Sequence, residues 1–265
     1  MTKSQYNSKK TEDAQAKSVQ LINLAKHIHF KQIDSTNTWA KCHFQQWAPE
    51  GVTLITAAEQ MGGRGRFKRE WVSPANLNIY ASFCFWLDEK REDVGCISQV
   101  LAIAAVKTIE SQGFPITIKW PNDLLLRGKK MGGILCETIV EEKKRGVVCG
   151  IGLNVNMPLD ALCQIDRPAT SLLVEAGRAF QVADLLVNLQ ERFLEDLTLF
   201  LREGFLPFFP LLHKYSALKK GQIVTFLNHL TRIEGQFECL RPDGSIELRF
   251  SDGSLKVFYS GEINY

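Results

Sequence analysis

Residues 116–156, ITIKWPNDLLLRGKKMGGILCETIVEEKKRGVVCGIGLNVN, decide the fold because apolar runs alternate there with turn signals. The runs cover residues 116–120, 130–140 and 146–156, and the breaks between them contain Pro-Asn-Asp, Arg-Gly and Lys-Lys-Arg-Gly. Short apolar runs bounded by such residues are typical of β-strands. This stretch therefore predicts a series of strands joined by tight turns.

The flanking sequence adds two strands and two long helices. Residues 51–58 and 78–87 are further buried-strand runs, the second dense in β-branched and aromatic residues. Between residues 94 and 111 apolar residues recur every three or four positions, which predicts a helix with one buried stripe. Residues 182–201 predict a second helix, ended by Gly204. The fold class expected is α+β, a mixed β-sheet with flanking helices.

The two ends of the chain differ from this middle part. Residues 1–20 are polar and charged, which predicts a flexible tail. After residue 216 the predicted strands are short and are separated by two Asp-Gly-Ser turns. We therefore expect a main domain over residues 21–215 and a small β-barrel over residues 216–265.

Composition excludes several classes of protein. Lys plus Arg is 32 and Asp plus Glu is 29, so the net charge of +3 is far from that of a dedicated nucleic-acid binder. The seven cysteines form no C-x-x-C pair and stand mostly in apolar runs, which predicts buried thiols in a reducing cytoplasm. No apolar run approaches the roughly 18 residues of a membrane span. We expect a cytoplasmic protein that binds neither membrane nor nucleic acid.

The most unusual segment is the loop over residues 62–71, GGRGRFKREW, in which three glycines and four cations stand beside one tryptophan. Glycine removes side-chain clashes and arginine donates two hydrogen bonds at once, so such a loop can place N–H groups against phosphate oxygens. The alternatives are a solvated basic surface loop and an arginine-glycine tract that binds RNA.

Three further clusters combine charged residues with turns or glycines. Residues 119–123, KWPND, place a cation, an amide and a carboxylate at a strand end, although the same residues also suit a simple capped turn. Residues 129–137, KKMGGILCE, lead a lysine into paired glycines and could equally be a hairpin turn. Residues 150–156, GIGLNVN, allow close approach of a ring or backbone but form a weak pattern alone.

Together these clusters resemble the biotin protein ligases, which are called holocarboxylase synthetases in animals. The family order is reproduced by Asp34-Ser35-Thr36-Asn37, the loop from Gly63 to Trp71, and residues 119–123, 130–137 and 150–154. The resemblance implies a class II synthetase-like biotin/lipoate ligase catalytic domain with a C-terminal SH3-like β-barrel. It also implies ATP-dependent formation of biotinyl-5'-AMP and transfer of biotin to one lysine of a carrier protein, with Mg²⁺.

The resemblance assigns roles by position. Lys130 matches the lysine that contacts the reacting carboxylate and the α-phosphate, and Asp123 is our candidate for orienting or deprotonating the acceptor amine, unless it only caps its turn. The biotin-binding residues implied are Ser35, Thr36, Asn37, Gln60, Arg64, Gly65, Arg66, Lys130 and Gly133, of which Arg64, Arg66 and Lys130 are also catalytic; the ATP-binding residues implied are Arg69, Trp71, Lys119, Asn122 and Asn154.

Two departures from the family pattern affect these expectations. Lys68 replaces a glycine found in many members, and lysine adopts positive φ less freely, which puts the closed form of the loop in doubt. Only about 33 residues precede Asp34, too few and too polar for a helix-turn-helix domain, so a DNA-binding domain is not expected and the chain resembles the monofunctional type.

The implied partner is the biotin carboxyl carrier protein of acetyl-CoA carboxylase, and whether the chain is a monomer or a homodimer stays open. The rival functions are a lipoate or octanoate ligase, a biotin-sensing DNA-binding regulator and an arginine-glycine RNA binder. The last is disfavoured by the near-neutral charge and by the lack of repeated aromatic stacking residues.

Overall fold

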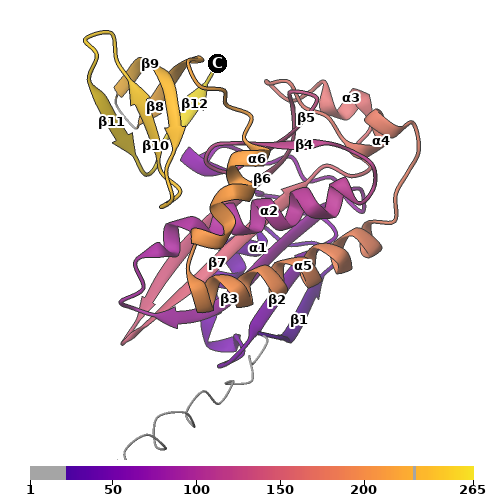
Figure 1. Cartoon of the computed structure of the whole chain (residues 1–265). Coiled ribbons are helices and arrows are strands. Elements are labelled where there is room, and N and C mark those ends of the chain that lie inside the picture. Colours follow the sequence, from indigo (N-terminus) through magenta and orange to yellow (C-terminus); the bar gives the residue numbers. More distant parts are fainter. Residues whose placement is uncertain (1–21, 229–230) are drawn as a thin grey trace, which may run out of the picture.

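The computed structural model describes residues 22–228 and 231–265, and its larger part is a seven-stranded mixed sheet (Figure 1). The strands lie in the order β1-β2-β3-β7-β6-β5-β4, and all neighbours are antiparallel except β1 and β2. The tail predicted for residues 1–20 lies outside the described residues. The strands are β1 (Leu24–Phe30), β2 (Val52–Ala57), β3 (Ile79–Asp88), β4 (Ile116–Lys119), β5 (Asp123–Leu126), β6 (Lys129–Glu141) and β7 (Lys144–Leu153).

Helices cover both faces of this sheet (Figure 1). The short helix α1 (Thr36–Cys42) packs on β2, β3 and β7 and begins at Ser35, whose hydroxyl accepts from the Thr38 N–H at 3.4 Å. On the opposite face α2 (Ile97–Glu110) contacts β4 to β7, and α5 (Val182–Glu203) packs on α2. As predicted, α5 ends at Gly204, where φ is +73° and the N–H donates to the Phe200 carbonyl.

The prediction of a single buried stripe on α2 was wrong. All residues of α2 except Ser98, Lys107 and Glu110 are buried. The helix lies between the sheet and α5, and Gln99 reaches the second sheet, so it is enclosed on several sides. Periodicity cannot reveal this, because alanine fits a buried and an exposed position equally well.

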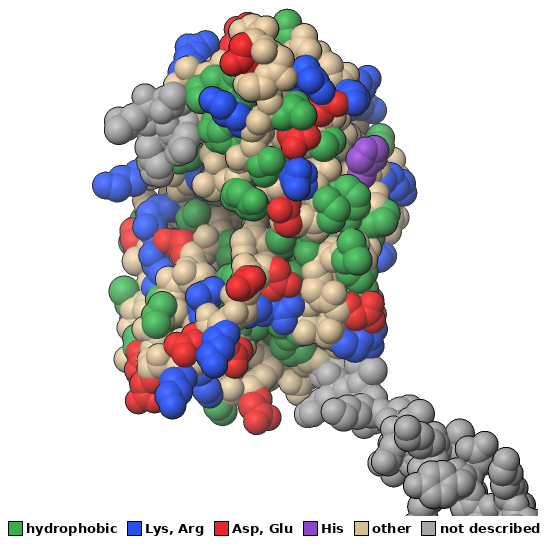
Figure 2. Space-filling view, turned by 60° about the vertical axis from the view of Figure 1, so that its left-hand side comes forward, with side chains coloured by type: hydrophobic (Ala, Val, Ile, Leu, Met, Phe, Trp, Pro, Cys, Tyr) green, Lys and Arg blue, Asp and Glu red, His purple; other side chains and the backbone are tan. Residues whose placement is uncertain are grey.

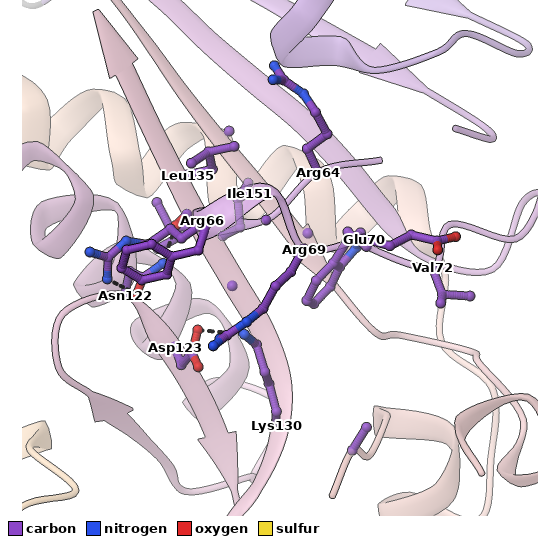
Figure 3. A pocket seen from close by; sticks show the side chains of 18 of the residues that line it. Arg64, Arg66, Arg69, Glu70, Val72, Asn122, Asp123, Lys130, Leu135 and Ile151 are labelled. Carbon is purple, nitrogen blue, oxygen red and sulfur yellow. Dashed lines mark hydrogen bonds and ion pairs between the residues drawn. The ribbon is translucent and has the colours of Figure 1, made fainter. Parts of the chain in front are cut away.

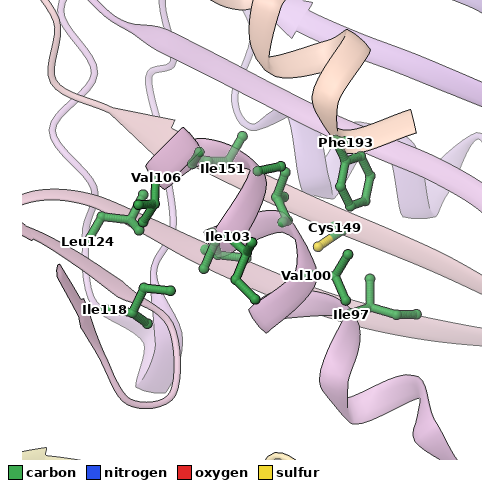
Figure 4. Packing of buried hydrophobic residues seen from close by; sticks show 14 of the residues in the cluster. Ile97, Val100, Ile103, Val106, Ile118, Leu124, Cys149, Ile151 and Phe193 are labelled. Atoms are coloured by element: carbon green, nitrogen blue, oxygen red, sulfur yellow. The ribbon is translucent and has the colours of Figure 1, made fainter. Parts of the chain in front are cut away.

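The core lies between the sheet and these two helices (Figure 4). Ile103 and Val106 of α2 face Leu124 and Ile151 of the sheet, and the ring of Phe193 of α5 packs at a tilt against Phe83 with ring centroids 4.7 Å apart. Central strands such as β2 are buried along their whole length because both faces are covered.

The C-terminal part forms a second sheet of five antiparallel strands in the order β11-β10-β9-β8-β12. This arrangement is consistent with the predicted SH3-like barrel. The barrel is open, however, because β11 and β12 do not pair among the described residues. The Trp120 indole N–H and the Gln99 amide both donate to the Gly244 carbonyl, which joins this sheet to the first. The strands are β8 (Ile223–Asn228), β9 (Thr231–Leu240), β10 (Ile246–Arg249), β11 (Leu255–Phe258) and β12 (Glu262–Asn264).

Short helices connect these elements. Three α-helical segments and four 3₁₀ turns complete the described part of the chain: α3 (Leu159–Leu162), α4 (Leu172–Ala176), α6 (Phe209–Tyr215), and η1 (Phe44–Gln46), η2 (Arg66–Lys68), η3 (Asp93–Cys96) and η4 (Leu206–Phe208). No helix among the described residues has the length and apolar character that crossing a membrane requires.

The cysteines only partly follow the prediction of buried thiols. Cys84, Cys96 and Cys149 are buried, but Cys42 and Cys163 are exposed, and all seven are unpaired. On the face shown in Figure 2, acidic and basic side chains are interspersed, which fits the small net charge.

Phe193 tests the role of α5 in the core, because this fully buried ring packs on Phe83. We expect Phe193→Ala to lower the free energy of unfolding by about 3–5 kcal/mol, since the surrounding residues cannot close the cavity. Denaturant titration measures the change. Val187→Ala on the same helix is the control, because Val187 is 52% exposed and should change stability by less than about 0.5 kcal/mol.

Candidate functional site

A cavity of about 470 Å³ lies against the α1 face of the large sheet and reaches the second sheet at Glu262. Strands, loops and α1 all contribute to its wall, so residues far apart in sequence meet there. It brings together every site residue predicted from the sequence: Ser35, Thr36, Asn37, Gln60, Arg64, Gly65, Arg66, Arg69, Trp71, Lys119, Asn122, Asp123, Lys130, Gly133 and Asn154.

One end of the cavity is a buried polar network at the start of α1. The Thr36 N–H donates to Gln60 Oε1 at 2.9 Å, so Gln60 groups with the residues of α1. The Asn37 amide donates to the Leu135 carbonyl at 3.0 Å, and its Oδ1 lies 2.6 Å from Ser82 Oγ. These bonds fix the rotamers of Thr36 and Asn37 before any ligand enters.

Glycines of β7 make room for this network and for Trp71. A Cβ at Gly150 would lie 2.0 Å from Asn37 Oδ1, and one at Gly152 would lie 2.4 Å from Trp71 Nε1. The Gly-x-Gly pattern, weak in the sequence, is therefore explained by close approach of two side chains to bare backbone. The Trp71 indole nitrogen is buried and finds no hydrogen-bond partner among the described residues, which leaves one donor for a ligand.

The arginine loop is folded onto the C-terminal strand β12. Arg66 donates to the Gly261 carbonyl at 2.8 Å and to Asn122 Oδ1 at 3.2 Å, while Arg69 forms two bonds of 2.8 and 2.6 Å with Glu262. Burial would raise the pKa of Glu262, but the hydrogen bond and charge of Arg69 outweigh it and lower that pKa. The bond is therefore an ion pair at neutral pH.

Lys68 does adopt the left-handed backbone that its replacement of glycine made doubtful. Its φ is +60°, and that of Phe67 is +56°. This conformation costs an L-residue about 1–2 kcal/mol. Contacts within and beyond the loop offset the cost, since Gly65 N–H donates to the Arg69 carbonyl at 2.8 Å and Arg66 lies over the Phe67 ring.

At the end of the cavity away from Arg64, Lys130 and Asp123 form an ion pair of 2.6 Å (Figure 3). Both side chains are about 20% exposed, and Lys130 Nζ also lies 5.6 Å from the centre of the Trp71 ring. The carboxylate of Asp123 thus faces a cation across the hairpin of β5 and β6. A lysine so placed can exchange its carboxylate for another anion, and the freed carboxylate can then accept a proton.

Lys119 lies beside the C-terminus of the chain. Its ammonium lies 3.3 Å from Asn264 Oδ1 and 5.5 Å from the centre of the Tyr265 ring. Burial lowers the pKa of Lys119, while Asp123 and Glu262 act in the opposite direction.

The two predicted asparagines are bound to the main chain. The Asn122 amide donates to the Ile134 carbonyl at 2.5 Å and the Asn154 amide to the Thr170 carbonyl at 3.1 Å. The first bond joins the turn before β5 to β6, and the second fastens the segment after β7. Each side chain lines the cavity while holding its wall in place.

Sequence reasoning missed several residues at this site. Glu137, within a recognised motif but without a role, pairs with Lys41 at 2.6 Å and Arg64 at 3.5 Å. Glu262 lines the cavity from the second sheet, and the segment 164–167 lines it after β7. Of these residues, only Glu137 could have been found from the sequence, because it ends the 130–137 motif.

The described residues contain no cluster of three or more His, Cys, Asp or Glu side chains that could hold a metal ion. Magnesium usually binds through one or two carboxylates together with substrate phosphates. Two carboxylates that line the cavity could serve in that mode, Asp123 and Glu262, and each is paired with a cation in this structure.

Residues 29–154 match the biotin/lipoate A/B protein ligase family. The bifunctional ligase/repressor BirA of Bacillus subtilis is 33% identical over 89% of this chain and 73% of its own length, and the biotin–[acetyl-CoA-carboxylase] ligase of Paracoccus denitrificans is 29% identical over 86% and 98%. The structure of biotin protein ligase from Aquifex aeolicus with biotin and ATP is similar with a TM-score of 0.75, at 28% identity over 91% of this chain and 98% of that one.

The Arg69–Glu262 pair provides a test of how the arginine loop is held. We expect Glu262→Ala to speed trypsin cleavage after Arg66, Lys68 or Arg69 about two- to fivefold, because a half-exposed ion pair contributes up to about 1 kcal/mol against local opening. Glu247→Ala is the control, since it removes a pair with Arg241 elsewhere in the same sheet. Mass spectrometry of the fragments over time measures the rate of cleavage in the loop. Equal rates in Glu262→Ala and Glu247→Ala would show that Glu262 does not hold the loop.

Proposed function

We propose that this chain, which belongs to the biotin/lipoate A/B protein ligase family, is an ATP-dependent biotin ligase that forms biotinyl-5'-AMP and transfers biotin to a carrier lysine. The observation that carries the proposal is the meeting, in one cavity, of a buried polar network, an arginine loop and the Lys130–Asp123 pair. This combination suits a polar ring at one end and an acyl-phosphate at the other.

In the first step the carboxylate of biotin attacks the α-phosphorus of ATP and pyrophosphate leaves. Lys130 exchanges Asp123 for the reacting oxygens, and Arg64 and Arg66 offset the negative charge on phosphate and carboxylate. Trp71 and Arg69, with Lys119, form the nucleotide side, and the unpaired Trp71 N–H supports that placement. The enzyme contributes position and charge and forms no covalent bond itself.

In the second step the neutral ε-amine of the carrier lysine attacks the acyl carbon, and AMP leaves. A free lysine has a pKa of about 10.4, so the amine must first lose a proton. We infer that Asp123 takes this proton, and the ion pair with Lys130 supports the inference, because the Asp123 carboxylate becomes available when Lys130 turns to a bound anion. Magnesium enters as the Mg–ATP substrate.

The proposed acceptor is a biotin carboxyl carrier protein, as in acetyl-CoA carboxylase. Seven unpaired thiols support a cytoplasmic location. We further propose that residues 21–215 form the catalytic unit and residues 216–265 a smaller unit that supports the nucleotide end through Gly261 and Glu262. We also propose that it acts without nucleic acid, as a monomer or a homodimer.

Exchange of labelled pyrophosphate into ATP tests the first step directly. We expect exchange that depends on biotin and saturates with it, and a mass increase of one biotin on a carrier protein incubated with Mg-ATP. Lipoate in place of biotin is the matched control for the rival ligase, because it shares the carboxylate but lacks the urea ring. Exchange with lipoate alone would overturn the proposed substrate.

Gly152 tests the nucleotide side. A Cβ there would lie within 2.4–2.8 Å of the Trp71 indole, so the ring must move in Gly152→Ala. We expect KM for ATP in the exchange assay to rise roughly ten- to a hundredfold, because displacement by about 1 Å is this costly at a site. Gly95→Ala is the control, as no atom lies within 4 Å of its added carbon. An unchanged KM in both variants would remove Trp71 from the nucleotide site.

A further inference from the structure

Glu137 stands at the end of a hydrogen-bond chain that runs through the buried polar network to the arginine loop. Its Oε2 accepts from the Asn37 amide at 3.0 Å, and its Oε1 accepts from Lys41 at 2.6 Å. Beyond Asn37 the chain continues through Ser82, Thr36 and Gln60, whose Nε2 donates to Ser73 Oγ at 3.0 Å; Ser73 in turn donates to the Trp71 carbonyl.

The protons on this chain can be counted from its Glu137 end. The two N–H groups of Asn37 face Glu137 and the Leu135 carbonyl, neither of which has a proton to give. Asn37 Oδ1 therefore faces Ser82 as an acceptor, 2.6 Å from its hydroxyl oxygen. The single proton of Ser82 must go to Asn37.

The same count shows that the Thr36 hydroxyl has no proton left for a ligand. Thr36 Oγ1 lies 2.8 Å from Ser82 Oγ and 3.2 Å from Gln60 Oε1, so the one proton of the Thr36 hydroxyl is used within the chain, on one of these two oxygens. Gln60 Oε1 also accepts from the Thr36 N–H at 2.9 Å, which fixes the orientation of the Gln60 amide. Thr36 is left with acceptor lone pairs, and Gln60 with one unused N–H.

We propose that Glu137 is a positioning residue that holds the Asn37 amide in one orientation, with Oδ1 toward Ser82, and so keeps in place the start of α1, where the cavity offers an acceptor at Thr36 beside a donor at Gln60. A cyclic urea carries N–H donors and one carbonyl acceptor, so this pattern complements it, while a dithiolane ring has no such groups. The inference rests on the proposed function, since it takes the urea ring of biotin as the ligand of this end.

The surroundings of Glu137 keep it an acceptor. Its side chain is 22% exposed, and burial would raise its pKa, but the hydrogen bonds from Lys41 and Asn37 outweigh burial and lower that pKa. Arg64 Nη2, 3.5 Å away, adds a second positive charge. The carboxylate is therefore ionised at neutral pH and both of its oxygens face donors.

Glutamine at this position creates a conflict that can be relieved. In Glu137→Gln one side-chain oxygen becomes NH₂, and either orientation sets that group against Lys41 or against Asn37. The charged Lys41 is the stronger donor, so the oxygen turns to it and Asn37 loses its acceptor. In Lys41→Met/Glu137→Gln the NH₂ can face the vacated position, which returns the oxygen to Asn37.

Calorimetric titration with biotin is the test, with melting curves to confirm that each variant is folded. We expect Kd for biotin to rise roughly tenfold or more in Glu137→Gln. In Lys41→Met/Glu137→Gln it should return to within about threefold of the value for the unmodified chain, and Lys41→Met alone should also stay within about threefold of that value. In the exchange assay KM for biotin should follow Kd, while kcat and KM for ATP stay within about threefold.

The outcomes separate the two proposals. No biotin binding by the unmodified chain would overturn the proposed function itself. Normal binding by the unmodified chain together with equal binding by Glu137→Gln would overturn only the role of Glu137. A double variant that binds no better than Glu137→Gln would show that the ion pair with Arg64, which the second substitution does not restore, is what matters instead.

Discussion

The site depends on bare backbone along one face of β7. At Gly150 and Gly152 the strand has no side chain, and Asn37 and Trp71 occupy the space that a Cβ would take. Both side chains thereby rest on the rigid centre of a seven-stranded sheet, between β3 and β6. A loop and a short helix alone would leave them mobile, so the precision of the cavity comes from this contact with the sheet.

Charge at the site is organised as pairs that a ligand can exchange. Arg64 faces Glu137, Lys130 faces Asp123, and Arg69 faces Glu262, each within 3.5 Å. Partly buried cations without partners would repel one another and pay for desolvation, so these carboxylates stabilise the ligand-free protein. An anionic substrate that replaces one of them meets a cation already in place, which lowers the cost of reorganisation during the reaction.

The second sheet also helps to build the cavity. Gly261 and Glu262 of the C-terminal segment hold the arginine loop, and Gly244 is fixed by Trp120 from the strand end that carries Lys119. The hydrophobic core is continuous from α2 into this sheet, through Val224 and Ile246. The position of the loop is therefore held by contacts with residues more than 190 positions away in sequence.

The sequence by itself determined five of the strand runs, α5 with its Gly204 end, and the motif residues that meet in the cavity, because these follow from local periodicity and from motifs that keep their spacing. It missed β1 and β5, misjudged α2, and left Glu137, Lys41 and Glu262 without roles. Only the tertiary structure decided these, because burial of α2 on several sides, an open five-stranded sheet and ion pairs between distant strands depend on which surfaces meet. A carboxylate carries the same local signal whether it faces water or a buried amide, and its partner across the fold makes the difference.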